Sequence, residues 1–140
     1  MATKKAILDA SALVAIVSKE RGHEVLTTII MAGSAATTPT GLAEALTVCR
    51  RNGHKQSRED LSNGLRDIGL KIESIIEEDA VEIAFLLAKS DALRNRKVGS
   101  LSLGDATCLA VAFRLDATAV MSDNTWEILG IPGLKIMPFR

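Results

Sequence analysis

The sequence predicts a three-layer α/β fold in which a mainly parallel central sheet carries helices on both faces. Three observations support this prediction. Short apolar, β-prone segments alternate along the chain with longer segments of helical periodicity. The 140 residues suit one domain spanning residues 1–140. No internal repeat, low-complexity tract or linker breaks the alternation.

Strands are expected where a short apolar run ends at a polar residue or a turn signal. They cover residues 5–8, 35–38, 70–76, 118–122 and 134–139. Because strands that alternate with helices pair in parallel, their carboxyl ends should share one edge of the sheet.

Helices are expected between these strands, with limits set by breaking and capping residues. Gly22 breaks the first helical run, Asn52 and Gly53 stop a later one, and Ser57 with Asp60 has the spacing of a capping box. The expected helices cover residues 12–17, 23–31, 42–51, 57–69, 79–93, 105–113 and 126–129, with a flexible loop at 95–100.

Composition argues against several classes of function. The net charge of zero disfavours a protein that holds nucleic acid by bulk electrostatics. Neither a secretory signal nor a membrane span is predicted, and Cys49 and Cys108 fall inside apolar helical patterns, as expected for core residues in a reducing cytoplasm. No nucleophilic triad or phosphate-binding glycine loop is visible, and His23 and His54 lack metal-ligand spacing.

Asp105 stands at the start of a helix that is apolar on almost every side. No cation lies at helical spacing from it, and burial of an unpaired carboxylate is costly. The alternative is structural, because Ser102 and Asp105 also have the spacing of a capping box.

Three further acids are expected near the same edge of the sheet. Asp9 and Asp123 end the first and fourth strands, and Glu44 lies early in the helix after the second strand. Each has a structural alternative: Asp9 as a helix cap, Glu44 as a surface residue and Asp123 in an Asx turn. If the four converge, their repulsion calls for a cation, and an all-oxygen cluster suits Mg²⁺ or Mn²⁺.

Four segments together resemble the PIN-domain nucleases, specifically the VapC-type toxins of bacterial toxin-antitoxin pairs. The segments are ILDASAL, LAEAL, SLSLGDATCLAVA and VMSDNTW. The resemblance implies that Asp9, Glu44, Asp105 and Asp123 form the catalytic and metal-binding quartet, with Ser11 beside the first acid. Met121 departs from the family, which often has threonine at this position.

The resemblance implies a metal-dependent endoribonuclease that leaves 5′-phosphate and 3′-hydroxyl ends. It also implies a homodimer whose acidic pocket is covered by a small antitoxin. An apolar surface for that partner is expected on the two helices after Asp9, although packing on the sheet explains most of its residues equally well. These residues are Leu13, Ile16, Val17, Val25, Ile29 and Ile30.

Other classes of protein compete with this hypothesis. An inactive PIN-like scaffold that only binds RNA or protein would share the fold. A phosphoacceptor receiver domain would also bind Mg²⁺, but it needs paired acids after the first strand, and Asp9 lies between Leu8 and Ala10. A D-x-D phosphatase is disfavoured by Ser11. The RNA target stays open among transfer, ribosomal and messenger RNA.

Overall fold

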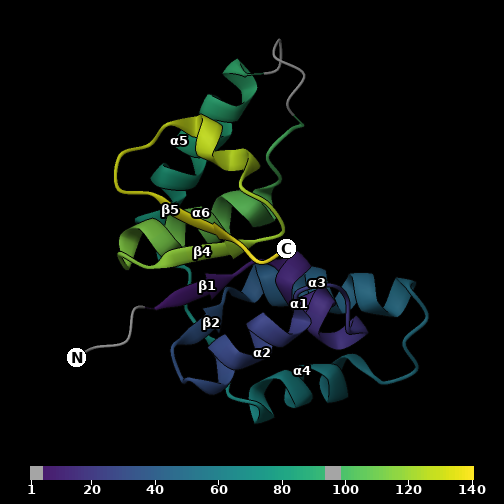
Figure 1. The fold of residues 1–140 in the computed structure, drawn as a ribbon. Coiled ribbons are helices and arrows are strands. Elements are labelled where there is room, and N and C mark those ends of the chain that lie inside the picture. The colour runs from purple at the N-terminus through teal and green to yellow at the C-terminus, as the bar shows by residue number, and fades with distance from the viewer. Residues whose placement is uncertain (1–4, 94–98) are drawn as a thin grey trace.

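The computed structural model describes residues 5–93 and 99–140 and contains one sheet of five parallel strands in the order β3-β2-β1-β4-β5 (Figure 1). The strands are β1 (Ala6–Leu8), β2 (Ala35–Thr37), β3 (Lys71–Ile72), β4 (Thr118–Met121) and β5 (Lys135–Pro138). The predicted α/β fold with a parallel sheet is confirmed.

Helices cover both faces of this sheet, with α1 to α4 on one side and α5 and α6 on the other (Figure 1). They are α1 (Ala10–Ser18), α2 (His23–Met31), α3 (Pro39–Arg51), α4 (Arg58–Asp67), α5 (Asp79–Ala92), α6 (Leu103–Arg114) and the 3₁₀ helix η2 (Thr125–Leu129). The loop predicted at 95–100 falls mostly outside the described residues. Among those that are described, no helix has the length and apolarity needed to cross a membrane.

The sheet separates two apolar cores because successive strand residues face opposite sides. Leu8 and Val120 pack with α1 to α4, whereas their neighbours Ile7 and Ala119 pack with α5 and α6. Helix α6 is buried from Ala106 to Ala112, as its uninterrupted apolar sequence predicts. The two cysteines lie in different cores, Cys49 on the α1 side and Cys108 on the α6 side.

Side-chain caps begin the helices at the carboxyl edge of the sheet. Asp9, Thr38 and Ser102 each accept a hydrogen bond from the backbone N–H group three residues later. Thr38 with Pro39 starts α3 three residues before the predicted helix start, since proline is well suited to the first helical position.

Strand β3 is shorter than predicted, with two residues in place of the seven at 70–76. Within the described part of the chain it pairs with β2 alone, at Lys71 and Ile72, and the backbone N–H of Glu73 makes one further bond to Thr37. The chain then turns toward α5, where Asp79 Oδ2 accepts a hydrogen bond from the backbone N–H of Ile76. An edge strand with a single neighbour has little to hold its continuation in place.

An ion pair between the buried Asp79 and the partly exposed Arg114 joins α5 to the end of α6. Asp79 is 2% exposed, and its Oδ1 accepts a hydrogen bond of 2.9 Å from Arg114 Nε. Arg114 Nη2 also donates to the backbone oxygen of Ser74. This buried acid therefore has a local cation that compensates its charge.

We predict that Arg114→Met lowers the free energy of unfolding by about 3 kcal/mol, because it leaves the buried Asp79 carboxylate unpaired. Urea unfolding followed by circular dichroism measures the effect. The control Arg66→Met removes an exposed arginine on α4 and should cost under about 0.5 kcal/mol. Adding Asp79→Asn to Arg114→Met should restore part of the loss, and equal destabilisation by both single arginine variants would contradict this account.

Candidate active site

Asp9 lies between β1 and α1 and is almost completely buried, with 5% of its surface exposed. Its Oδ1 accepts hydrogen bonds from the Ser11 hydroxyl at 2.7 Å and from the backbone N–H of Ala12 at 3.0 Å. Asp9 therefore caps helix α1, as the structural alternative predicts, but capping alone does not account for the acids around it. Ser11 lies beside the acid, as the sequence predicts.

Burial raises the pKa of Asp9 from 3.8 to about 6. The hydrogen bonds from Ser11 and Ala12 lower the pKa, while the charges of Asp105 and Glu44 raise it further. The electrostatic influence of two acids on a third means that α1, α3 and α6 bring these carboxylates near one another.

Asp105 occupies the first turn of α6, where its backbone N–H donates to the Ser102 hydroxyl at 3.0 Å. Its pKa is raised mainly by burial, then by the negative charges of Glu44 and Asp123, against a lowering by the Ser102 side chain. All four predicted acids are thus linked electrostatically. The charges of Glu44 and Asp123 act on Asp105, and the charges of Asp105 and Glu44 act on Asp9.

Glu44 reaches from α3 to the start of α6, and Gly104 makes room for it. A Cβ atom at Gly104 would lie 2.7 Å from Glu44 Oε2, closer than van der Waals contact permits. The carboxylate therefore lies against the amino end of α6, where the helix dipole favours negative charge. Glu44 is exposed, as its structural alternative requires, but it faces the other acids.

Asp123 is exposed after β4 and forms the Asx turn that the sequence allows. Its Oδ1 accepts a hydrogen bond of 2.9 Å from the backbone N–H of Thr125. Hydrogen bonds from Thr125 lower the pKa of Asp123, and the nearby Arg140 guanidinium lowers it further. Met121, two residues earlier, is 3% exposed and packs in the α6-side core, and its thioether has no hydroxyl to offer the site.

The carboxylates share an edge without forming a metal-ligand cage. Within residues 5–93 and 99–140, no group of three or more acidic, histidine or cysteine side chains is arranged to hold a metal ion. None of the ion pairs between described residues involves Asp9, Glu44 or Asp105. The site is therefore a set of mutually repelling acids. The hydrogen bonds that Asp9 and Asp123 accept come from residues close to them in sequence.

Two charged residues at this site, Glu20 and Arg140, were not predicted from the sequence. Together with Ser11 and Glu44 they line a cavity of about 250 Å³, whose apolar walls come from α1 and α3. One signal was available, because Arg140 directly follows the last predicted strand and so leaves the sheet at its carboxyl edge.

A model of the PIN domain matches residues 6–130 of the chain. No curated protein matches it at a significant level.

Several solved toxin structures are similar in fold. The sarcin-ricin loop cleaving toxin VapC20 of Mycobacterium tuberculosis is 16% identical with a TM-score of 0.70, over 94% of this chain and 99% of that toxin. A chain of a toxin-antitoxin complex from Klebsiella pneumoniae is 19% identical with a TM-score of 0.69, over 97% and 98% of the two chains. VapBC2 from Rickettsia felis, bound to a promoter DNA fragment, gives 16% identity and a TM-score of 0.69, over 95% and 97%. At such identities the likeness concerns the fold.

The raised pKa of Asp9 predicts a pH-dependent loss of stability in metal-free buffer. The folded protein binds the Asp9 proton more tightly than the unfolded chain does. The contribution of this proton to the free energy of unfolding is therefore greatest below pH 3.8 and is lost as the pH rises through about 6. The separation between 3.8 and about 6 corresponds to about 3 kcal/mol.

Asp9→Asn removes the titrating group while its Oδ1 can still accept from Ser11 and Ala12. We therefore expect the variant to be about 2–3 kcal/mol more stable than the wild type at pH 8 in EDTA, with the two converging toward pH 4. Chemical unfolding across this pH range is the measurement. Parallel stability curves would show that Asp9 carries no such cost.

Proposed function

The chain belongs to the PIN domain family, and we propose that it is a metal-dependent endoribonuclease, the toxin of a toxin-antitoxin pair. The observation that carries this proposal is the convergence of Asp9, at the start of α1, with Glu44 of α3 and Asp105 of α6. Two of these acids have raised pKa values, and none of the ion pairs between described residues involves them. The VapC fold of the structural neighbours supports the same class.

The donor set fits a hard divalent ion, Mg²⁺ or Mn²⁺. It consists of carboxylate oxygens, and the cation would relieve the repulsion that raises the pKa values of Asp9 and Asp105. Asp9 and Asp105 are the principal ligands in this proposal, and Glu44 and Asp123 bind directly or through water. When bound, the ion lowers the pKa of a water molecule and offsets charge on the phosphate oxygens.

The protein's own residues orient this donor set. Both hydrogen bonds to Asp9 from described residues end on Oδ1, so Oδ2 would be the oxygen available to an ion. Ser11 fixes the rotamer of that carboxylate, and Ser102 fixes the first turn of α6 that carries Asp105. Thr125 holds Asp123 at the open side of the site, where an RNA strand would approach.

Membership of the PIN family distinguishes among the competing hypotheses. A receiver domain and a D-x-D phosphatase belong to other families and are excluded. The inactive scaffold shares the PIN fold, and the lack of a formed ligand cage among the described residues is the observation that favours it. A scaffold would show neither saturable Mn²⁺ binding nor cleavage that EDTA stops.

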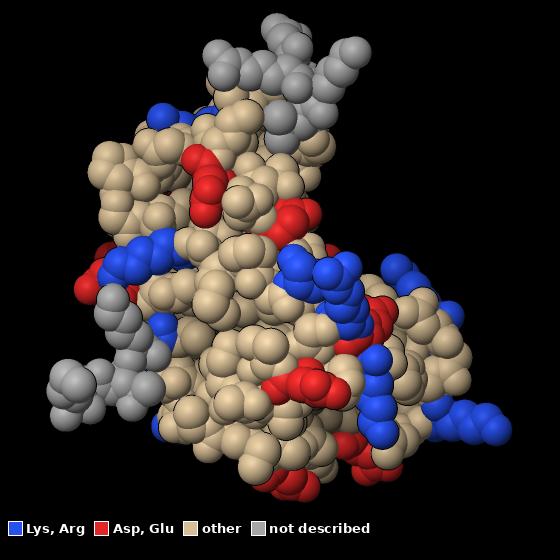
Figure 2. All heavy atoms as spheres, in the orientation of Figure 1, with Lys and Arg blue, Asp and Glu red and all other residues tan. Residues whose placement is uncertain are grey.

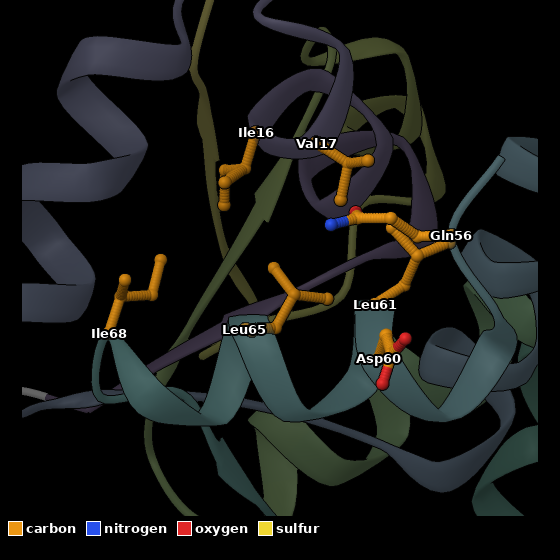
Figure 3. Close-up of a pocket in the computed structure, with 8 residues that line it drawn as sticks. Ile16, Val17, Gln56, Asp60, Leu61, Leu65 and Ile68 are labelled. Atoms are coloured by element: carbon orange, nitrogen blue, oxygen red, sulfur yellow. The ribbon is translucent and has the colours of Figure 1, made fainter. Parts of the chain in front are cut away.

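A small antitoxin is the proposed protein partner, and the surface expected for it is corrected by the structure. Leu13 and Ile30 are fully buried in the core, whereas Val25 is 51% exposed. Ile16 and Val17 of α1 face Leu61 and Leu65 of α4 across a groove of about 250 Å³ (Figure 3). We propose that an apolar segment of the antitoxin occupies this groove. A homodimer and a cytoplasmic location complete the proposal.

Asp9→Asn and Asp105→Asn should each lower RNA cleavage by about a thousand-fold or more, because each removes a metal-binding charge. The assay is cleavage of total cellular RNA with Mg²⁺, Mn²⁺ or EDTA, followed by mapping of the product ends. We expect 5′-phosphate and 3′-hydroxyl ends. Cyclic phosphate ends, or full activity in both folded variants, would refute the metal-dependent mechanism.

Gly104→Ala should weaken Mn²⁺ binding by about ten-fold, because the added methyl group displaces the Glu44 carboxylate. Isothermal titration calorimetry measures the affinity. Alanine favours a helix over glycine, so stability should not fall. The matched control is Gly64→Ala on α4, where a Cβ meets open space and Mn²⁺ affinity should stay the same. Equal Mn²⁺ affinity in both variants would show that Glu44 takes no part in binding the ion.

A further inference from the structure

The last residues of the chain lie at the mouth of the candidate active site. Strand β5 runs parallel to β4, and the backbone N–H of Phe139 donates to Met121 O at 3.0 Å. Arg140 thus emerges at the same edge as Asp9 and Asp123. The C-terminal end lies beside α1 and α3 in Figure 1, in agreement with the residues of the shared cavity.

This position is fixed by tight packing against the turn between α1 and α2. Phe139 is 5% exposed, and a Cβ atom at Gly22 would lie 2.4 Å from its backbone oxygen. Gly22 also has a φ of 92°, a conformation that suits glycine. The Arg140 guanidinium lies 5.0 Å from the centre of the Phe139 ring, so the charged group itself rests against a buried aromatic side chain.

The Arg140 side chain lies beside the acids, and its charge is only partly neutralised by them. Its Nη1 lies 3.4 Å from Glu20 Oε1, and the side chain is 33% exposed. An exposed pair at this distance is weak. Figure 2 shows basic groups flanked by acidic ones in the region where Figure 1 marks the C-terminal end.

An RNA strand meets a strongly unfavourable potential at this edge. Even with one divalent ion bound, the four carboxylates keep a net negative charge, which repels the phosphates of the substrate. A fixed cation at the rim counteracts this repulsion, and a guanidinium presents paired donors to phosphate oxygens.

We propose that Arg140 binds a phosphate of the RNA next to the cleaved bond, and that Glu20 holds the guanidinium until the RNA displaces it. This inference rests on the proposed function and names a substrate-binding residue for it. Because the contact is made equally in the ground state and the transition state, it acts on KM and leaves kcat nearly unchanged.

The test compares Arg140→Met, Arg140→Lys and the wild type on a short single-stranded RNA that the enzyme cleaves. For Arg140→Met we expect KM to rise about ten-fold with kcat within about two-fold. The slope of log affinity against log salt concentration should fall by about 0.7, the value for one lost phosphate contact. Arg140→Lys should keep the salt slope and recover part of the affinity. The control Arg66→Met, which removes an exposed arginine on α4, should change neither quantity.

An unchanged KM and salt slope in folded Arg140→Met would overturn the inference while leaving the nuclease in place. So would the same loss of affinity in Arg66→Met, which would indicate a general charge effect. If the wild type cleaves no RNA, the proposed function fails instead. Arg140 is then tested by RNA binding alone, measured by fluorescence anisotropy with Mg²⁺ in the wild type and in Arg140→Met, where the same drop in salt slope is expected and its absence overturns the inference.

Discussion

The burial of the Asp9 carboxylate at the junction of β1 and α1 is the constraint on which the candidate site depends. Two hydrogen bonds compensate only part of its desolvation, since the pKa still rises to about 6. Glu44 of α3 and Asp105 in the first turn of α6 add further negative charge. The fold thus holds an unfavourable group in place, a situation typical of functional sites.

Asp79 is as deeply buried as Asp9, but Arg114 binds it directly and the pair ties α5 to α6. Asp9 has neighbours of its own sign instead. Both acids hold local backbone N–H groups, so hydrogen bonding alone does not distinguish a structural carboxylate from a functional one. The sign of the neighbouring charges distinguishes them, since Asp79 has a cation beside it and Asp9 has other acids.

The sheet and the positions of the four acids could be predicted because they depend on local patterns: short apolar runs, capping residues and the shared edge of parallel strands. The extent of β3 could not, since it depends on pairing with a single neighbour. The roles of Gly104 and Arg140 arise from contacts between segments far apart in sequence, with Glu44 and with Glu20. Periodicity places Leu13 and Val25 alike on apolar helix faces, and tertiary packing alone decides that one is buried and the other exposed.

The placement of the two thiols on opposite sides of the sheet has a practical consequence. Cys108 Sγ lies 3.6 Å from the backbone oxygen of Ile7, burial holds its pKa well above the usual range, and Cys49 belongs to the other core. A disulfide between them would have to pass through the β-sheet, so it cannot form while the domain stays folded. An intramolecular disulfide between Cys49 and Cys108 in a preparation therefore marks molecules that unfolded before they were oxidised.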